Sequence, residues 1–245
     1  MKHLLGYVIW NKAEQIEWLI DGILESFDPK QVDLAFVFDN PTDGSFGKFT
    51  ELLPKLSAYN VVFVKVTGVD TYKFPCQNYL LEFAIEKRKY KTLICPQDDQ
   101  KITDPYMIHN IENILDRDRH VGVIGLRDGF EFGYGNMVSS SWSESEYDQP
   151  RLNNGAWNQV KLINDGPIVY PISTIKKVGT HDVESYNRFY IEDDYCMKCN
   201  EAGLRNYVMG NSLIHDRSKS SVASDHYSSN FGEQDLIKFR NKWNV

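Results

Sequence analysis

The stretch FVFDNPTDGS, residues 36–45, runs from hydrophobic residues into an aspartate and then into turn-forming residues. The hydrophobic residues predict the end of a buried strand, and Pro41, Asp43 and Gly44 are typical of a turn. One interpretation of Asp39 is therefore a plain strand end. The other is a carboxylate that faces a ligand, because open α/β sheets bind ligands at the carboxyl ends of their strands.

On both sides of this stretch, apolar strands alternate with amphipathic helices as far as about residue 126. We expect strands at 4–10, 34–38, 61–66, 92–95 and 121–126, and helices at 16–27, 46–56, 79–87 and from Asp104 onward. The alternation predicts a mostly parallel, Rossmann-like sheet with helices on both faces and right-handed crossovers. No G-x-G-x-x-G and no G-x-x-x-x-G-K-[ST] motif follows these strands, so we expect neither a dinucleotide site nor a P-loop.

The composition is that of a globular protein with a full core. The 245 residues, 42% of them hydrophobic and 25% charged, are enough for one large domain. A net charge of −7 without a basic tract argues against a nucleic-acid partner. The cysteine pair Cys196 and Cys199 lacks the further ligands of a zinc site. No apolar run reaches the roughly 18 residues of a membrane span, and we expect a cytoplasmic protein.

The alternating pattern stops near residue 127. Residues 128–160 are rich in Gly, Ser, Asn and aromatic residues. A disordered insertion is one interpretation, but disordered segments are usually poor in aromatics, which favours a loop or hairpin that orders over a ligand. Helical character returns near 193–202 and 233–242. We expect a single domain over residues 1–245, with one half at 1–126 and a smaller, mixed half at 127–245.

Acidic residues stand at the ends of predicted elements in three places: Asp39, Asp98-Asp99 and Glu192-Asp193-Asp194. Asp98 and Asp99 repel each other unless a cation or hydrogen-bond donors compensate, and oxygen ligands of this kind suit Mg²⁺ or Mn²⁺ shared with a diphosphate. The alternative for this pair is a solvated turn. For Asp193 and Asp194 it is helix N-capping. For His215 it is a hydrogen-bonded position in the core.

Taken in order, the motifs of the first half resemble those of the inverting family-2 glycosyltransferases, which have the GT-A fold. VIWN (8–11) is similar to the end of that family's first strand, and FVFDNPTDGS to its second-strand signature. Asn78–Ala84 is similar to an Asn-x5-Ala helix motif, with Gln77 where the family usually has Arg. CPQDDQ (95–100) stands where the D-x-D motif belongs.

The resemblance continues through the second half and so covers nearly the whole chain. YIEDDYCMKCNEAG (190–203) is similar to a Glu-Asp-x-Asp-Leu-x-x-x-Arg segment, one residue short and with Lys198 in place of Arg. His215, followed by Ser218 and Ser221, is similar to a His-and-Ser ending, and RNKWNV (240–245) to a Lys-Trp-Gly ending of some members. Pro96 replaces the first Asp of D-x-D, so phosphate and metal binding would depend on Asp98 or Asp99.

The resemblance implies a metal-assisted glycosyltransferase that moves a sugar from a UDP- or dTDP-sugar to an acceptor hydroxyl with inversion. In such an enzyme Asp39 would accept a hydrogen bond from N3–H of the uracil or thymine base, a charge-assisted bond. The residues that the resemblance assigns to the donor are Val8, Trp10, Asn11, Asp39, Asn78, Gln97 and Asp98. Those assigned to Mn²⁺ or Mg²⁺ are Asp98, Asp99 and His215.

The general base would be Asp193 or Asp194, because the deletion leaves the match ambiguous. We expect the acceptor pocket to include Trp142, Tyr147, Trp157 and Glu192, although a core position suits Trp157 equally well.

Two other functions stay open. A sugar nucleotidyltransferase has a similar architecture, but it normally carries a Gly-rich basic loop after the first strand, and VIWNKAEQ (8–15) has no glycine. A non-catalytic glycan- or nucleotide-binding module of the same fold is favoured by Pro96 in the D-x-D position. Release of pyrophosphate would identify the first, and donor hydrolysis with Mn²⁺ would argue against the second.

Overall fold

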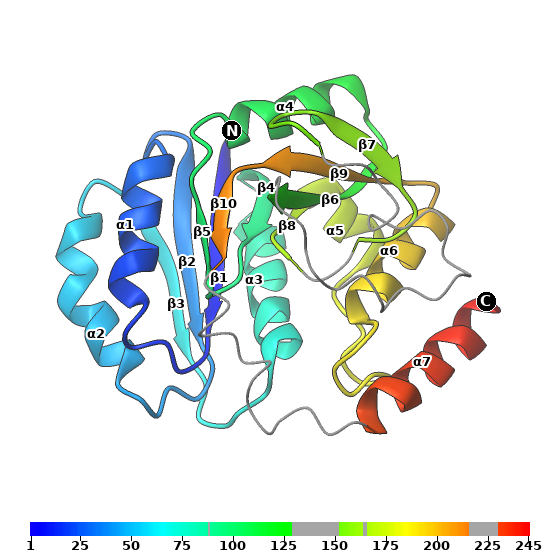
Figure 1. Ribbon diagram of the computed structural model, residues 1–245, viewed down its shortest axis with the longest axis horizontal. Coiled ribbons are helices and arrows are strands. Elements are labelled where there is room, and N and C mark those ends of the chain that lie inside the picture. The colour runs from blue at the N-terminus through cyan, green and yellow to red at the C-terminus, as the bar shows by residue number, and fades with distance from the viewer. Residues whose placement is uncertain (88, 129–151, 164–165, 216–229) are drawn as a thin grey trace.

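One eight-stranded sheet runs through both halves of the chain in the computed structural model, which describes residues 1–87, 89–128, 152–163, 166–215 and 230–245 (Figure 1). Its strands in spatial order are β3 (Val61–Val66), β2 (Val32–Phe38), β1 (Lys2–Ile9), β4 (Tyr90–Cys95), β8 (Ile168–Pro171), β6 (Val121–Asp128), β9 (Arg205–Asn211) and β7 (Trp157–Val160). A second, two-stranded sheet pairs β5 (Gln100–Ile102) with β10 (Leu213–His215) in antiparallel fashion.

The strand directions bring several strand ends to the same edge of the sheet. β1 lies between β2 and β4 and is parallel to both, and β2 is parallel to β3. β8 is antiparallel to β4 and to β6, and β6 is parallel to β9. The carboxyl ends of β1, β2, β4, β6 and β9 therefore lie along one edge, which we call the carboxyl edge. The expected mostly parallel sheet is confirmed.

Helices cover both faces of the sheet, as the sequence predicts (Figure 1). The first face carries α1 (Ile16–Ser26), α2 (Ser45–Leu52) and α4 (Met107–Arg117), and the second carries α3 (Lys73–Lys87), α5 (Ile172–Val178), α6 (Ile191–Glu201) and α7 (Asn230–Trp243). In β2, Phe36 and Phe38 pack toward the first set while Ala35 and Val37 pack toward the second. A strand buried on both faces reads as a near-continuous apolar run, which explains the hydrophobic residues 34–38 before Asp39.

Several element boundaries differ from the sequence predictions. The helix expected at 46–56 is divided in two. α2 ends at Leu52, and a short 3-10 helix, Leu53–Leu56, follows it with Pro54 in its first turn. Proline lacks the N–H that an α-helix interior needs. α4 begins at Met107, after a turn in which the Asp104 carboxylate accepts the N–H of Tyr106 at 2.9 Å. The strand-like segment 206–214 divides into β9 and the short β10, whereas the sequence does not predict strands β5, β7 and β8 or helix α5, because such short segments carry too little periodicity.

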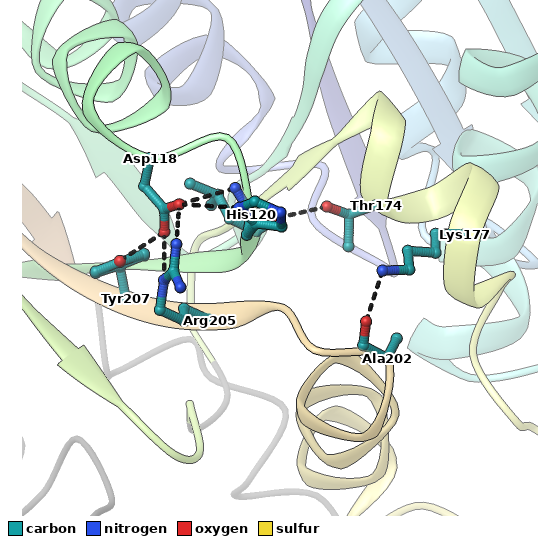
Figure 2. Close-up of polar contacts among 8 residues, drawn as sticks. Asp118, His120, Thr174, Lys177, Ala202, Arg205 and Tyr207 are labelled. Carbon is teal, nitrogen blue, oxygen red and sulfur yellow. Dashed lines mark hydrogen bonds and ion pairs between the residues drawn. The ribbon is translucent and has the colours of Figure 1, made fainter.

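At the opposite, amino edge of the sheet, a buried carboxylate joins the end of α4 to strand β9 (Figure 2). Asp118 follows α4 and accepts hydrogen bonds from Arg205 Nε at 2.8 Å and from the Tyr207 hydroxyl at 2.7 Å. It also accepts the backbone N–H of His120 at 2.8 Å. The hydrogen bond from Arg205 is the largest cause that holds the pKa of Asp118 well below its ordinary value.

Two further hydrogen bonds brace α5 against the same edge (Figure 2). The Thr174 hydroxyl donates to the carbonyl oxygen of Val121 at 2.6 Å, at the start of β6. Lys177 Nζ donates to the carbonyl oxygen of Ala202 at 2.6 Å, just after α6. The amino edge is thus a set of satisfied polar contacts that hold helices to strands.

We predict that Asp118→Asn lowers stability in a pH-dependent way. Because the pKa of Asp118 is depressed in the folded state, its ionised form stabilises the fold above the unfolded-state pKa of about 3.9, and this contribution is lost as the pH falls further. The melting temperature at pH 7 should fall by roughly 2–8 °C. The gap between the wild type and the variant should narrow as the pH is lowered from about 5 to about 3. A gap that stays constant over this range would contradict the assignment.

Candidate functional site

The loops after β1, β2 and β4 meet at the carboxyl edge through hydrogen bonds. The backbone N–H of Trp10 donates to Asp98 Oδ2 at 3.0 Å, which joins the end of β1 to the loop after β4. Asn11 Oδ1 accepts the N–H of Thr42 at 2.9 Å, which joins β1 to the loop after β2. The structure therefore brings together Trp10, Asn11 and Asp98, which the sequence had only suggested as neighbours.

Asp39 follows β2 at the same edge and is 1% exposed. Its Oδ1 accepts hydrogen bonds from the hydroxyl of Thr67 at 2.9 Å and from the N–H and hydroxyl of Thr71, both at 3.1 Å. Its Oδ2 accepts a longer bond from the Thr71 N–H, at 3.3 Å. One oxygen thus anchors the loop after β3, and the other keeps most of its capacity to accept.

Residues with left-handed backbone conformation cluster in the loops around this edge. They are Asn11 (φ 49°), Asn40 (φ 40°), Tyr72 (φ 70°) and Tyr190 (φ 61°). Asparagine tolerates this region, but for tyrosine it is uncommon. Such conformations persist only where the surrounding structure imposes them, and they concentrate at functional sites.

Asp98 lies among charged residues that are largely removed from water. Its side chain is 19% exposed, and its Oδ1 is 3.9 Å from Nζ of Lys12, a lysine whose side chain is only 5% exposed. The charge of Lys73, at the start of α3, also acts on Asp98, and its Nζ lies 3.6 Å from the buried carboxylate of Glu192. Burial raises the pKa of Asp98 to about 6, against the opposing charge of Lys12. An added cation would stabilise the ionised carboxylate.

The strand register places the backbone of His215, the third predicted metal ligand, opposite Gln100. His215 pairs with Gln100 in the β5–β10 sheet, next to the Asp98-Asp99 pair. Across the described residues, no three His, Cys, Asp or Glu side chains are arranged to hold a metal ion by themselves. Mg²⁺ and Mn²⁺ that act on diphosphates are commonly held by one or two carboxylates, with phosphate oxygens as further ligands. The donor set of Asp98 and Asp99 fits such a site.

The three acidic residues in the first turn of α6 differ in burial. Glu192 is 7% exposed and Asp194 is fully buried, whereas Asp193 is partly exposed. Asp194 Oδ1 accepts hydrogen bonds from the Tyr186 hydroxyl at 3.1 Å and from Trp243 Nε1 at 2.8 Å. It also forms an ion pair of 2.7 Å with Lys242. Asp194 is therefore committed to a contact between α6 and α7.

Other residues predicted for the donor and acceptor make structural contacts. The side-chain amide of Asn78 donates to the carbonyl oxygen of His181 at 3.0 Å and accepts its N–H at 2.9 Å. Val8 is partly buried and packs against the core of the second face. Trp157, on the edge strand β7, packs edge-on against Tyr207 with ring centroids 5.2 Å apart. These three positions hold the fold together.

The remaining predicted positions fall in two groups. The N–H of Gln97 donates to Oε1 of Gln100 at 3.3 Å, within the loop that carries Asp98 and Asp99. Trp142 and Tyr147 lie outside the described residues. Lys12 and Lys73 also lie near Asp98, and no sequence motif predicts them. The only available signal for Lys12 was its place directly after Asn11, and lysine there is equally typical of a solvated loop.

The mostly parallel sheet, its strand order and the helices on both of its faces are those of the GT-A fold. Solved structures share it. TarS from S. aureus (1–349, in complex with UDP-GlcNAc) has a TM-score of 0.65 and 14% identity, with 98% of this chain and 67% of that chain covered. The mannosyltransferase PcManGT from Pyrobaculum calidifontis (in complex with GDP-Man and Mn²⁺) has a TM-score of 0.62 and 14% identity, with coverage of 86% and 55%.

These similarities concern the fold. The chain spans about half of the mannosyltransferase, at 55%, and 36% of a longer TarS chain. No protein-family model and no curated protein matches the sequence. In the part of the chain that the structure describes, no helix is long and apolar enough to cross a membrane.

The different surroundings of Asp193 and Asp194 lead to a prediction about stability. Asp194→Asn removes a buried charge that is paired with Lys242 and should lower the free energy of unfolding by about 1–3 kcal/mol. Asp193→Asn removes a partly exposed charge at a helix start and should lower it by less than about 1 kcal/mol. Urea unfolding of both variants measures the difference. Equal losses would contradict the different burial of the two residues.

Proposed function

We propose that this chain is a glycosyltransferase that moves a sugar from a UDP- or dTDP-sugar to an acceptor hydroxyl with inversion of configuration. The observation that carries the proposal is the convergence of Asp39, Asp98 and the acidic start of α6 on the carboxyl edge of a GT-A sheet. Lys73 links these groups, because it pairs with Glu192 and its charge also acts on Asp98.

Asp39 would select the base of the donor. Its Oδ2 carries one long hydrogen bond from Thr71, so it can accept a further bond from a ring N–H. Uracil and thymine offer N3–H as such a donor, whereas adenine has no ring N–H at the corresponding edge. The neighbours of known structure were solved with nucleotide sugars of two different bases, UDP-GlcNAc in TarS and GDP-Man in the mannosyltransferase. Asp39 therefore supports UDP or dTDP over ADP, and because guanine also has a ring N–H, at N1, the preference over GDP follows from the resemblance of FVFDNPTDGS to the family's second-strand signature.

Asp98 and Asp99, with His215, would hold a divalent cation, Mn²⁺ or Mg²⁺. When bound, such a cation neutralises the negative charge of a leaving diphosphate. The mannosyltransferase of similar fold was solved with Mn²⁺. Lys12 and Lys73 add positive charge near Asp98, which favours the binding of a diphosphate and stabilises charge that develops on it.

Asp193 would act as the general base. An acceptor hydroxyl is far too weak an acid to ionise at neutral pH, so it needs a base as its oxygen attacks the anomeric carbon. The acceptor oxygen forms the new bond, the bond to the diphosphate oxygen breaks, and the hydroxyl proton passes to the Asp193 carboxylate. The positive end of the α6 dipole favours an ionised carboxylate there. Partial exposure favours Asp193 over the fully buried Asp194.

A non-catalytic nucleotide-binding module is the second candidate, and Pro96 in the D-x-D position favours it. Such a module would bind the nucleotide at the same edge without cleaving the donor. Hydrolysis or transfer of the donor sugar separates the two functions, because only the enzyme cleaves the donor.

The first prediction of this proposal concerns the base. Asp193→Asn should lower the turnover of sugar transfer or donor hydrolysis by about 10²- to 10⁴-fold and leave donor binding nearly intact. Asp116→Asn, which removes an exposed carboxylate from α4 near the amino edge, is the matched control and should keep normal turnover. Near-normal turnover in folded Asp193→Asn would rule this residue out as the base.

The second prediction concerns the donor nucleotide. UDP and dTDP should raise the melting temperature more than GDP and ADP, since a ligand at 100 times its Kd adds about 2.7 kcal/mol of stability. Asp39→Ala should abolish this preference. Because Asp39 also anchors Thr67 and Thr71, the ratio of affinities is compared and not the stability.

Calorimetry of UDP binding, once with Mn²⁺ and once with excess EDTA, tests whether a cation takes part in binding. We expect weaker binding in EDTA. Equal shifts for all four nucleotides would remove Asp39 from the proposal, and equal UDP affinity in EDTA would remove the metal.

A further inference from the structure

A buried carboxylate on the C-terminal helix binds the turn that leads into α6. Asp235 lies on α7 and is 0% exposed. Its Oδ2 accepts the backbone N–H groups of three consecutive residues, Asn187 at 3.0 Å, Arg188 at 2.9 Å and Phe189 at 3.0 Å. Its Oδ1 accepts Nδ2 of Asn187 at 2.9 Å. None of the motifs that support the proposed function includes Asp235.

These bonds make the buried charge stable. A carboxylate removed from water is unfavourable unless donors replace its hydration. Burial raises the pKa of Asp235, but the hydrogen bonds from Arg188, Asn187 and Phe189 outweigh that effect and hold the pKa below its ordinary value. The charged carboxylate therefore fixes the conformation of residues 187–189.

The turn that Asp235 fixes ends where α6 begins. The next residue is Tyr190, the N-cap of α6, in the left-handed conformation at φ 61°. Its ring packs against Phe239 of α7 with centroids 5.6 Å apart, and its carbonyl oxygen accepts the N–H of Asp194 at 2.8 Å. An uncommon backbone conformation of this kind must be held by its surroundings, and Asp235 supplies the hydrogen bonds directly before it.

The C-terminal end of α7 holds the same segment from the other side. Trp243 and Lys242 bind the carboxylate of Asp194, and Lys242 also lies 3.0 Å from Asp182. α7 thus contacts the chain both just before α6 and in its first turn, and Asp193 lies between these two anchors. Figure 1 shows α7 beside the loop that enters α6.

We propose that Asp235 is a positioning residue for sugar transfer: by holding the turn at 187–189 it sets the start of α6, and with it the direction in which Asp193 meets the acceptor hydroxyl. This role rests on the proposed function. General-base catalysis requires hydrogen-bond geometry, and a displacement of about 1 Å can lower turnover by about 100-fold. Asp235 touches neither donor nor acceptor in this scheme, so its loss should act on turnover and not on nucleotide binding.

The test uses two substitutions. In Asp235→Asn, either orientation of the amide puts an NH₂ group against donors, the backbone N–H groups on one side or Asn187 Nδ2 on the other. Asp235→Glu keeps the charge but lengthens the side chain by one methylene, so it serves if the first variant does not fold. Asp118→Asn is the matched control, because Asp118 is also a buried carboxylate that accepts backbone and side-chain hydrogen bonds, but at the amino edge.

For each folded protein, kcat and donor KM for transfer or hydrolysis, UDP affinity and melting temperature are measured. We expect the Asp235 variants to lose about 10- to 100-fold in kcat, with UDP affinity within about two-fold of the wild type. Asp118→Asn should lose melting temperature but keep its kcat.

Normal kcat in a folded Asp235 variant would overturn the positioning role and leave the proposed function intact. Loss of UDP affinity in step with kcat would also overturn it, since that pattern indicates a general disturbance of the site. If the wild type itself transfers or hydrolyses no sugar from any nucleotide donor, the proposed function fails and the positioning role fails with it.

Discussion

The position of β1 between two parallel strands is the constraint on which the rest of the molecule depends. It is hydrogen-bonded on both sides to parallel strands, with Leu4 and Leu5 fully buried. Because parallel neighbours all end at the same edge, the loops after β1, β2 and β4 must meet there. The hydrogen bond from Trp10 to Asp98 is a direct consequence, and the cluster of polar residues at the carboxyl edge follows from it.

The two edges of the sheet use carboxylates in different ways. At the amino edge, Asp118 is saturated by donors, with hydrogen bonds that lower its pKa. At the carboxyl edge, burial outweighs the available donors and raises the pKa of Asp98 to about 6. A carboxylate whose oxygens accept several hydrogen bonds stabilises the fold. A buried carboxylate with too few donors is unfavourable in its ionised form, and a ligand that supplies positive charge would stabilise it. This contrast separates residues of the fold from residues of the proposed site.

Much of the fold and part of the site could be predicted from the sequence. The alternation of strands and helices predicted the mostly parallel sheet, because burial on both faces requires apolar runs such as residues 34–38. The short strands β7 and β8 were beyond prediction, since their pairing is decided by partners far along the chain. The contact of Asn78 with His181 was beyond prediction as well, because the two residues are 103 positions apart and only the folded chain brings them together.

The sequence alone determined which chemical groups are available: Asp39 after a buried strand, the pair Asp98-Asp99, and three acidic residues before a helix. Only the tertiary structure decided their surroundings. Asp193 and Asp194 are adjacent in the chain, yet Asp194 is buried against Trp243 and Lys242 while Asp193 stays partly exposed. The physical reason is that burial and hydrogen bonding depend on distant segments, here the helix α7, whose contacts with α6 no local pattern encodes.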